Sequence, residues 1–315
     1  GTANVAAWGT IPGMQQSKSC ELYAIAGRNI EKAENYKERF GFEVAYGSYD
    51  ELLEDKEVQA IYIPLPNNLH KVWVKKALKA GKNVLCEKPI GLSAEETREM
   101  YKAAEESGVL LMEAYAYLHS PYVDSLKKEV GSGIIGDVDY IETAFITQGY
   151  KEDIRLHKDL GGGAMYDLGC YCTTMILSII DVDPVMVKAD AEFSDEGIDL
   201  MTAGLIRFDN GVRASFNVGM ILGENTNSRF DRLYIHGTKG SIRSDVEYNE
   251  EGNVFYKIYQ GEEVIVRQLN VPHNYSLEIE QFSRCILYGE EPHITADFSI
   301  KNAELIDKVI NEIGY

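Results

Sequence analysis

The chain has 315 residues, of which 45% are hydrophobic, and its formal net charge is −19. This length suits about two globular domains, and the acidity opposes a phosphate backbone, which excludes nucleic acid as an expected partner. No stretch approaches the roughly 18 consecutive apolar residues of a membrane span, and no secretory signal opens the chain, so we expect a cytoplasmic protein without a membrane partner.

The first third of the sequence alternates apolar runs with charged amphipathic segments. The apolar runs predict strands at 22–27, 60–66, 83–89 and 108–117. The segments between them predict helices at 28–41, 68–81 and 94–107, the last opened by Ser93 and Glu96 as a capping box. Strands that alternate with helices of this length form βαβ units with a parallel sheet. We therefore expect residues 1–118 to form an α/β domain of the dinucleotide-binding Rossmann type. The fold class of the whole chain is then α/β followed by α+β.

After residue 118 the pattern changes, and we expect a second, α+β domain over residues 119–315, to which we assign substrate binding and oligomerisation. A helix at 121–130 precedes an alternating strand at 137–147, and the glycine-rich start of 161–180 predicts a loop that leads into a buried helix. Further strands are predicted at 186–193, 202–208, 212–220, 230–236 and 254–268. They form an open, mostly antiparallel sheet. Amphipathic helices at 276–289 and 299–315 follow, and we expect the last helix to pack back on the first domain.

The five cysteines are an odd number and are dispersed, which argues against a disulfide framework. Cys170 and Cys172 form a C-x-C pair, but no second pair or histidine cluster completes a zinc site. We favour plain packing for both residues and expect no metal ion.

The first residues, GTANVA, match a dinucleotide-binding fingerprint in which alanines replace the second and third glycines. Because such a glycine normally follows a buried strand, we expect the intact polypeptide to carry a short apolar strand before Gly1. Arg28 comes just after the next strand, where the adenosine ribose binds. An arginine there suits the 2′-phosphate of NADP better than the 2′-hydroxyl of NAD, although a solvated arginine at a helix start is the alternative.

The motif Glu87-Lys88-Pro89 ends an apolar strand with an acid, a lysine and a residue that cannot donate to a sheet. Ligands of open α/β sheets bind beyond the carboxyl ends of the strands, so Lys88 is expected beside the nicotinamide. A lysine there holds a substrate oxygen and lowers the pKa of a neighbouring proton donor. A surface lysine that caps a helix would explain neither the apolar run nor the proline.

With YIPLPNNLH before the Glu-Lys-Pro motif, GGGAMYDLGCY after it and YSLEIEQF near the end, the chain resembles the glucose-fructose oxidoreductase / inositol dehydrogenase (Gfo/Idh/MocA) family. The likeness covers essentially the whole chain and is greatest to the branch of dihydrodiol and xylose dehydrogenases. It implies NADP as the preferred cofactor and NAD as the second choice, a small sugar, polyol or cyclic diol as substrate, and a homodimer or homotetramer formed through the second sheet.

The resemblance also implies a role for each matching residue. Hydride passes between the nicotinamide and a carbinol carbon, Tyr171 exchanges the hydroxyl proton, Lys88 steadies the oxygen, and Asp167 orients substrate or lysine. The implied cofactor contacts are Gly1, Thr2, Ala3, Asn4, Val5, Arg28, Pro64, Leu65, Asn67, His70, Glu87 and Lys88. The implied substrate contacts are Lys88, Tyr117, His119, Arg155, Asp167 and Tyr171.

Three alternatives stay open at this stage. Tyr171 is one of 20 tyrosines and by position alone is as consistent with a core aromatic residue as with a proton donor. Related folds also include glycosidases that retain a nicotinamide with no net redox change, and sensors that bind a dinucleotide without turnover. Where this branch often has an arginine, the chain has Leu118, with His119 one step early, so the sequence does not define the substrate.

Overall fold

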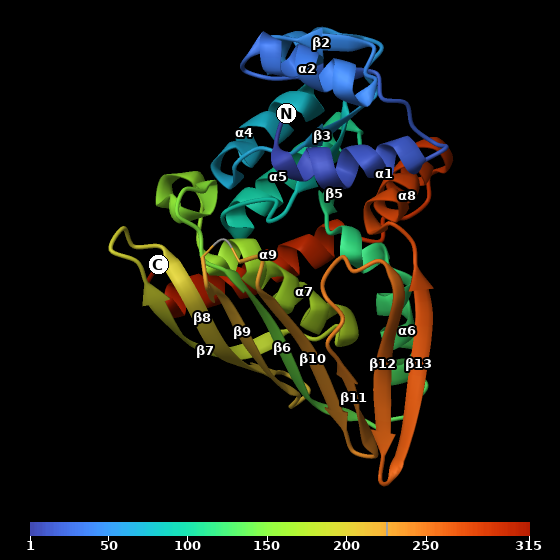
Figure 1. Ribbon diagram of the computed structural model, residues 1–315, viewed down its shortest axis with the longest axis vertical. Coiled ribbons are helices and arrows are strands. Elements are labelled where there is room, and N and C mark those ends of the chain that lie inside the picture. The colour runs from blue at the N-terminus through green and yellow to red at the C-terminus, as the bar shows by residue number, and fades with distance from the viewer. Residues whose placement is uncertain (225) are drawn as a thin grey trace. The chain divides into compact units, whose positions relative to one another are not determined.

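A computed structural model describes residues 1–224 and 226–315 of the chain (Figure 1). They form two compact units, each of which contains two segments of the sequence. Unit 1 contains Gly1–His119 and His273–Ile300, and unit 2 contains Ser120–Pro272 and Lys301–Tyr315. The first boundary lies next to the expected one at 118/119. The segment that returns to unit 1 is 273–300, whereas residues 301–315 of the last helix belong to unit 2.

The strands of unit 1 are short and pair in parallel, β1 with β2 and β4 with β3 and β5. They are β1 (Ala24–Ala26), β2 (Val44–Tyr46), β3 (Ala60–Ile63), β4 (Asn83–Glu87) and β5 (Leu111–Ala114). A helix follows each of the first four strands, as parallel pairing requires. The prediction of a parallel α/β fold in the first third of the chain is confirmed.

The helices of unit 1 begin and end where local sequence signals place them. They are η1 (Ala6–Thr10), α1 (Ile11–Gln16), α2 (Ile30–Phe40), α3 (Tyr49–Glu54), α4 (Asn67–Lys79), α5 (Ala94–Ser107), η2 (Ala116–His119) and α8 (Asn274–Tyr288). The side chains of Asn29, Ser48 and Ser93 each accept a hydrogen bond from a backbone N–H three residues later. Gly41 and Gly108 end α2 and α5 in the left-handed conformation.

Helix α8 belongs to unit 1 because the first helical run makes room for it. A Cβ atom on Gly9 would lie 2.8 Å from the Tyr275 ring, and one on Gly13 would lie 2.7 Å from the Tyr275 backbone. Farther along α8, both carboxylate oxygens of Glu280 accept hydrogen bonds from the segment at 17–19. The two glycines therefore fix α8 against the helix that opens the chain.

Unit 2 is built on an eight-stranded sheet with the order β13-β12-β11-β10-β6-β9-β8-β7 (Figure 1). The strands are β6 (Val138–Gln148), β7 (Pro184–Phe193), β8 (Asp199–Phe208), β9 (Arg213–Leu222), β10 (Arg229–Gly237), β11 (Gly240–Ser244), β12 (Gly252–Gln260) and β13 (Glu263–Val271). Strands β6 and β9 pair in parallel and the other neighbours are antiparallel. The expected open, mostly antiparallel sheet is confirmed.

Two details of this sheet differ from the prediction. The single strand expected at 254–268 is wrong, because β12 and β13 form a hairpin in which Gln260 pairs with Glu263 and Gly261 turns with a φ of 58°. The inward-facing positions change from even numbers on β12 to odd numbers on β13, so this change of phase and Gly261 are the signals that mark two strands. Strand β11 was not predicted, because only two residues link it to β10.

The helices of unit 2 are α6 (Pro121–Gly131), the π-helical turn η5 (Met165–Gly169), α7 (Cys170–Ile179) and the greater part of α9 (Ala296–Ile313). Helix α7 packs on β6 and β9. The hydroxyl of Thr173 on α7 donates to Asn302 Oδ1 on α9 at 2.6 Å. None of the described helices has both the length and the apolar character needed to cross a membrane.

Candidate active site

In unit 1 the fingerprint residues lie against the segments that follow β1 and β3. A Cβ atom on Gly1 would lie 3.3 Å from the side chains of Pro64 and Leu65, and one on Gly27 would lie 3.4 Å from Thr2. The chain turns helical at Asn4, directly after Gly1, Thr2 and Ala3 of the fingerprint. The N–H groups at a helix start are the groups that bind a phosphate in such folds.

Arg28 is exposed directly after β1. It interacts with the Tyr49 hydroxyl, and its charge favours the ionised form of that phenol, although burial is the larger effect and raises the Tyr49 pKa. The guanidinium is thus held at the strand end and not dispersed in solvent. This placement is compatible with a ligand phosphate.

His70, predicted as a cofactor contact, is fully buried. Its Nδ1 is 2.9 Å from the Pro89 carbonyl oxygen and its Nε2 is 2.8 Å from the Leu65 carbonyl oxygen. Burial lowers the pKa of the ring. The structure thus shows His70 tying the loop after β3 to the loop after β4. Asn67 opens α4 beside the same loop.

The Glu-Lys-Pro motif lies at the carboxyl end of β4, as predicted. Glu87 is the last residue of the strand and accepts a hydrogen bond from the Tyr62 hydroxyl on β3. Its other carboxylate oxygen accepts from the Lys88 backbone N–H at 3.3 Å. The Lys88-Pro89 peptide is cis, and the Lys88 side chain is partly exposed. Glu87 therefore links the Lys88 backbone N–H to the Tyr62 hydroxyl on β3 through hydrogen bonds.

Two further buried acids surround this loop. Glu113 on β5 accepts a hydrogen bond from the Ile90 backbone N–H at 2.9 Å, and burial raises its pKa to about 7. Glu278 on α8 is fully buried and has no hydrogen-bond partner among the described residues. Burial, and then the charge of Glu87, raise its pKa well above the usual range. The Ile90 end of the loop that holds Lys88 is therefore fixed by a carboxyl group whose pKa lies near neutrality.

The raised pKa of Glu113 predicts a pH-dependent stability. A carboxyl with an unfolded value of 4.5 and a folded value of about 7 binds more protons in the folded state, so the free energy of unfolding falls as pH rises between these values. A difference of this size corresponds to roughly 3 kcal/mol. Glu113→Gln keeps the acceptor for Ile90 and removes the charge. Urea titrations from pH 5 to 8 should show a flatter pH dependence in the variant, and parallel curves would contradict this assignment.

Tyr117 and His119, predicted as substrate contacts, pack inside unit 1 and are 2% and 6% exposed. The His119 ring stacks on His293 with 5.2 Å between ring centroids, and burial lowers its pKa to about 3. A neutral, packed imidazole is a core residue here. Leu118, where the branch often has an arginine, is likewise buried.

In unit 2 the structure brings Arg155 and Asp167 together. Arg155 Nε donates to Asp167 Oδ2 at 2.6 Å and Nη1 donates to Asp153 Oδ1 at 3.0 Å. The charge of Asp167 raises the pKa of Arg155, and the Asp167 side chain is 16% exposed. This pairing was not predicted, although both residues were.

The triple glycine at 161–163 lets the backbone pass close to Arg155 and Asp199. A Cβ atom on Gly162 would lie 2.3 Å from the Arg155 carbonyl oxygen, and one on Gly163 would lie 2.1 Å from Asp199 Oδ1. The other oxygen of Asp199 accepts from the Met165 backbone N–H at 2.8 Å. Only glycine allows the backbone to pass between these groups. The turn η5 then carries Asp167 into the helical run that contains Tyr171.

The rings of Tyr171, Phe145 and Tyr248 pack against one another and form an aromatic wall. The Tyr171 ring lies edge-on to Phe145 at 5.4 Å and tilted against Tyr248 at 5.2 Å, while Phe145 and Tyr248 stack at 5.0 Å. Tyr171 is only partly buried. Asp167 lies within the π-helical turn and Tyr171 in the α-helix that directly continues it, and such turns are often found at functional sites.

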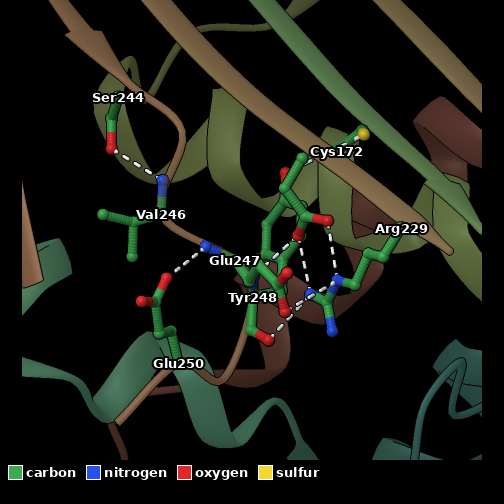
Figure 2. Close-up of polar contacts among 8 residues, drawn as sticks. Cys172, Arg229, Ser244, Val246, Glu247, Tyr248 and Glu250 are labelled. Atoms are coloured by element: carbon green, nitrogen blue, oxygen red, sulfur yellow. Dashed lines mark hydrogen bonds and ion pairs between the residues drawn. The ribbon is translucent and has the colours of Figure 1, made fainter. Parts of the chain in front are cut away.

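Sequence reasoning missed the residues that hold this wall. Figure 2 shows the segment after β11 fastened to the start of β10. Arg229 forms a two-pronged ion pair with Asp231 at 2.6 and 2.7 Å, and its Nη2 also donates to the Tyr248 carbonyl oxygen at 2.9 Å. The Tyr248 hydroxyl contacts Cys172 Sγ at 3.8 Å. No sequence signal links positions 229 and 248, because their contact depends on the fold.

All five cysteines are free, and four of them, including Cys170 and Cys172, are buried. Among the described residues, no group of three or more His, Cys, Asp or Glu is arranged to hold a metal ion.

A parallel α/β unit with a lysine at a strand end, joined to an open-sheet unit with an aspartate and a tyrosine on one helical run, defines a dinucleotide-dependent oxidoreductase. The chain belongs to the Gfo/Idh/MocA oxidoreductase family. The model of the oxidoreductase family with an NAD-binding Rossmann fold matches residues 1–115, and the GFO/IDH/MocA C-terminal domain model matches residues 123–243. The predicted family, fold class and enzyme class are confirmed.

Named relatives are similar over nearly the whole chain. The D-xylose 1-dehydrogenase (NADP(+)) 2 of Haloferax volcanii is 30% identical over 98% of this chain and 94% of its own. The trans-1,2-dihydrobenzene-1,2-diol dehydrogenase of Xenopus tropicalis is 29% identical over the same shares. A 3-ketoreductase from Actinomadura kijaniata, solved in complex with NADP and TDP-benzene, has a TM-score of 0.92 and 28% identity, covering 99% of this chain and 96% of its own.

Proposed function

We propose that the protein is an NADP-dependent dehydrogenase or reductase that acts on a carbinol or carbonyl carbon of a sugar, polyol or cyclic diol. The observation that carries this proposal is the Arg155-bound Asp167 and the partly exposed Tyr171 on one helical run. The names of the relatives support the substrate class, since they act on xylose, a dihydrodiol and a keto sugar. The presence of NADP in a solved neighbour supports the cofactor.

Each of the three central residues has one role in this proposal. Tyr171 exchanges the proton of the substrate hydroxyl, since a positioned phenol serves as general acid and base. Lys88 holds the reacting oxygen and favours the ionised phenol. Asp167, fixed by Arg155, orients the substrate. NADP, when bound, accepts or supplies the hydride.

The residues in unit 1 suit NADP. The start of the helical run at Asn4 offers N–H groups to the pyrophosphate. Arg28 offers a charge to the 2′-phosphate, and Pro64 and Leu65 lie beside Gly1 where the dinucleotide crosses the strand ends. Asn67, Glu87 and Lys88 complete the proposed contacts.

Arg28→Ala should weaken NADP binding more than NAD binding. The lost contact to a phosphate is charge-assisted and is worth roughly 1.5 to 3 kcal/mol, whereas NAD offers Arg28 only a neutral 2′-hydroxyl. Fluorescence titration of the reduced cofactors measures both affinities without a substrate. Lys32→Ala is a matched control on the adjacent helix. An equal loss for NADP and NAD would show that Arg28 does not read the 2′-phosphate.

The experiment that tests the proposed function is a panel of sugars, polyols and cyclic diols offered with NADP and with NAD. Absorbance at the reduced-nicotinamide band reports net oxidation of the substrate. We expect turnover on at least one substrate with a secondary hydroxyl, faster with NADP. Hydrolysis of a glycoside without cofactor reduction would instead indicate the glycosidase alternative.

We further propose that the enzyme is cytoplasmic and forms a homodimer or homotetramer through the sheet of unit 2. Large apolar side chains are exposed on its strands, among them Leu205, Phe255, Val264 and Val266, which are 49–60% exposed. Water-exposed apolar groups in such number favour a covered face.

Leu205→Glu with Phe255→Glu should therefore lower the assembly state. Both side chains lie on strands of the sheet and neither is in the proposed site. Light scattering at micromolar concentration should show a dimer or tetramer for the natural chain and a smaller species for the variant. The same mass for both, or a natural monomer, would refute the proposed interface.

A further inference from the structure

Arg229 is held more tightly than a surface arginine. It is the first residue of β10, and three of its N–H contacts go to groups in unit 2: two to Asp231, whose side chain is 1% exposed, and one to the Tyr248 carbonyl oxygen. Asp231 also accepts from the Tyr248 backbone N–H at 2.8 Å. The guanidinium is thus fixed in orientation before any ligand binds.

One nitrogen of this guanidinium is left over. Nη1 makes no hydrogen bond with any residue between 1 and 224 or 226 and 315. Figure 2 shows this nitrogen without a dashed line, beside the two that are bound. The side chain is 27% exposed, so the remaining donor is accessible from solvent.

The same guanidinium lies on the aromatic wall that contains Tyr171. Its Cζ is 4.5 Å from the centroid of the Phe145 ring, and Phe145 contacts the Tyr171 ring at 5.4 Å. Arg229 and the Tyr171 phenol are close enough to interact electrostatically. A fixed donor therefore lies on the wall that holds the proposed proton carrier.

The charge around Arg229 favours a neutral ligand group over an anion. Asp231 neutralises the guanidinium, and Glu247 approaches its Nε to 3.5 Å. These three side chains together carry a formal charge of −1, which repels a carboxylate or phosphate. A hydroxyl or carbonyl oxygen accepts a hydrogen bond from Nη1 without this repulsion.

We propose that Arg229 is a specificity-determining residue whose Nη1 donates to the substrate oxygen on the carbon next to the reacting carbinol. This inference rests on the proposed function, because it takes Tyr171 as the proton carrier at the reacting oxygen. It selects substrates with two neighbouring oxygens, as in a 1,2-diol or a sugar ring. A substrate without the second oxygen leaves the donor unpaired in the complex.

The test compares two substrates across a set of variants. The substrates are the best sugar or diol from the panel and its analogue that lacks the neighbouring hydroxyl, for which cyclohexane-1,2-diol and cyclohexanol are the simplest pair. The variants are Arg229→Gln and Arg229→Lys, which both remove the forked donor, and Arg232→Gln as the control. Arg232 lies on the same strand, is exposed, and pairs with Glu142.

We expect the natural chain and Arg232→Gln to prefer the diol by about 10- to 100-fold in kcat/KM, the range for one hydrogen bond to a charged group. In both Arg229 variants this ratio should fall to within about threefold of unity, chiefly because kcat/KM for the diol decreases. If Arg229 had only a structural role, its variants would have a lower kcat/KM for both substrates by the same factor. The ratio between the substrates would then be unchanged, and this result would overturn the proposal. If Arg229→Gln does not fold, Arg229→Lys carries the test, because it keeps a cation for Asp231.

Tyr171→Phe, measured beside the Arg229 variants, distinguishes a failure of the role proposed for Arg229 from a failure of the catalytic role on which it rests. Loss of turnover on both substrates together with an unchanged ratio in the Arg229 variants would refute the role of Arg229 alone. Normal turnover in Tyr171→Phe would refute Tyr171 as the proton carrier, on which this inference rests, whatever Arg229 does, whereas absence of cofactor reduction with every substrate of the panel would refute the proposed function itself.

Discussion

Replacing Lys88 with methionine or Tyr171 with phenylalanine should lower turnover by about 10² to 10⁴, the usual contribution of general acid-base catalysis. Cofactor affinity should stay nearly intact, because neither residue is expected to hold the adenosine or the pyrophosphate. The effect corresponds to roughly 3 to 5 kcal/mol in the activation free energy. Turnover, cofactor affinity and melting temperature of each variant check this result.

The double variant distinguishes a catalytic pair from two structural residues. Groups that act as one unit are not additive, so Lys88→Met with Tyr171→Phe should be little worse than the worse single variant. If both residues were structural, the losses would add and melting temperature would fall in step with activity. Near-normal turnover in Tyr171→Phe would mean that another group carries the proton, such as the exposed His157 or a water.

Gly162→Ala should lower turnover by about 10²-fold without any change to a catalytic group. The added Cβ would lie 2.3 Å from the Arg155 carbonyl oxygen and 2.9 Å from that of His157, so the loop must move. Both neighbours are backbone atoms and cannot rotate away. A displacement of about 1 Å in a positioning residue is enough for a loss of this size, and overpacking costs a further 1 to 3 kcal/mol or so in stability.

Gly131→Ala is the matched control for this substitution. Gly131 ends α6 in the same unit, and a Cβ atom there would meet nothing within 4 Å. Its activity and melting temperature should therefore stay at or slightly above the natural values. Full activity in Gly162→Ala would mean that the pairing of Arg155 with Asp167 does not depend on the close passage of the loop.

The sequence was sufficient to predict features that depend on neighbours along the chain. The capped helices α2 and α5, the strand end that carries Lys88, and the glycine-rich entry to α7 each have a local signal, and each is found where expected. The family resemblance added the roles of Lys88, Asp167 and Tyr171, which spacing alone left undecided for the tyrosine.

Features that depend on contacts between distant segments were not predictable in this way. His70 looked like a ligand contact, yet its two ring nitrogens bind carbonyl oxygens from two separate loops. The pairing of Arg229 with Tyr248 joins positions that are 19 residues apart on different elements.

The most direct test of the central claim follows the hydrogen of the carbinol carbon. The best substrate from the panel is prepared with deuterium at that carbon and incubated with the natural enzyme and NADP, and the reduced cofactor is isolated and analysed by mass spectrometry. We predict stoichiometric reduced cofactor carrying one deuterium, and no such product with Tyr171→Phe on the same time scale. Conversion of a substrate without net cofactor reduction, or reduced cofactor without deuterium, would contradict the assignment of this protein as a carbinol oxidoreductase.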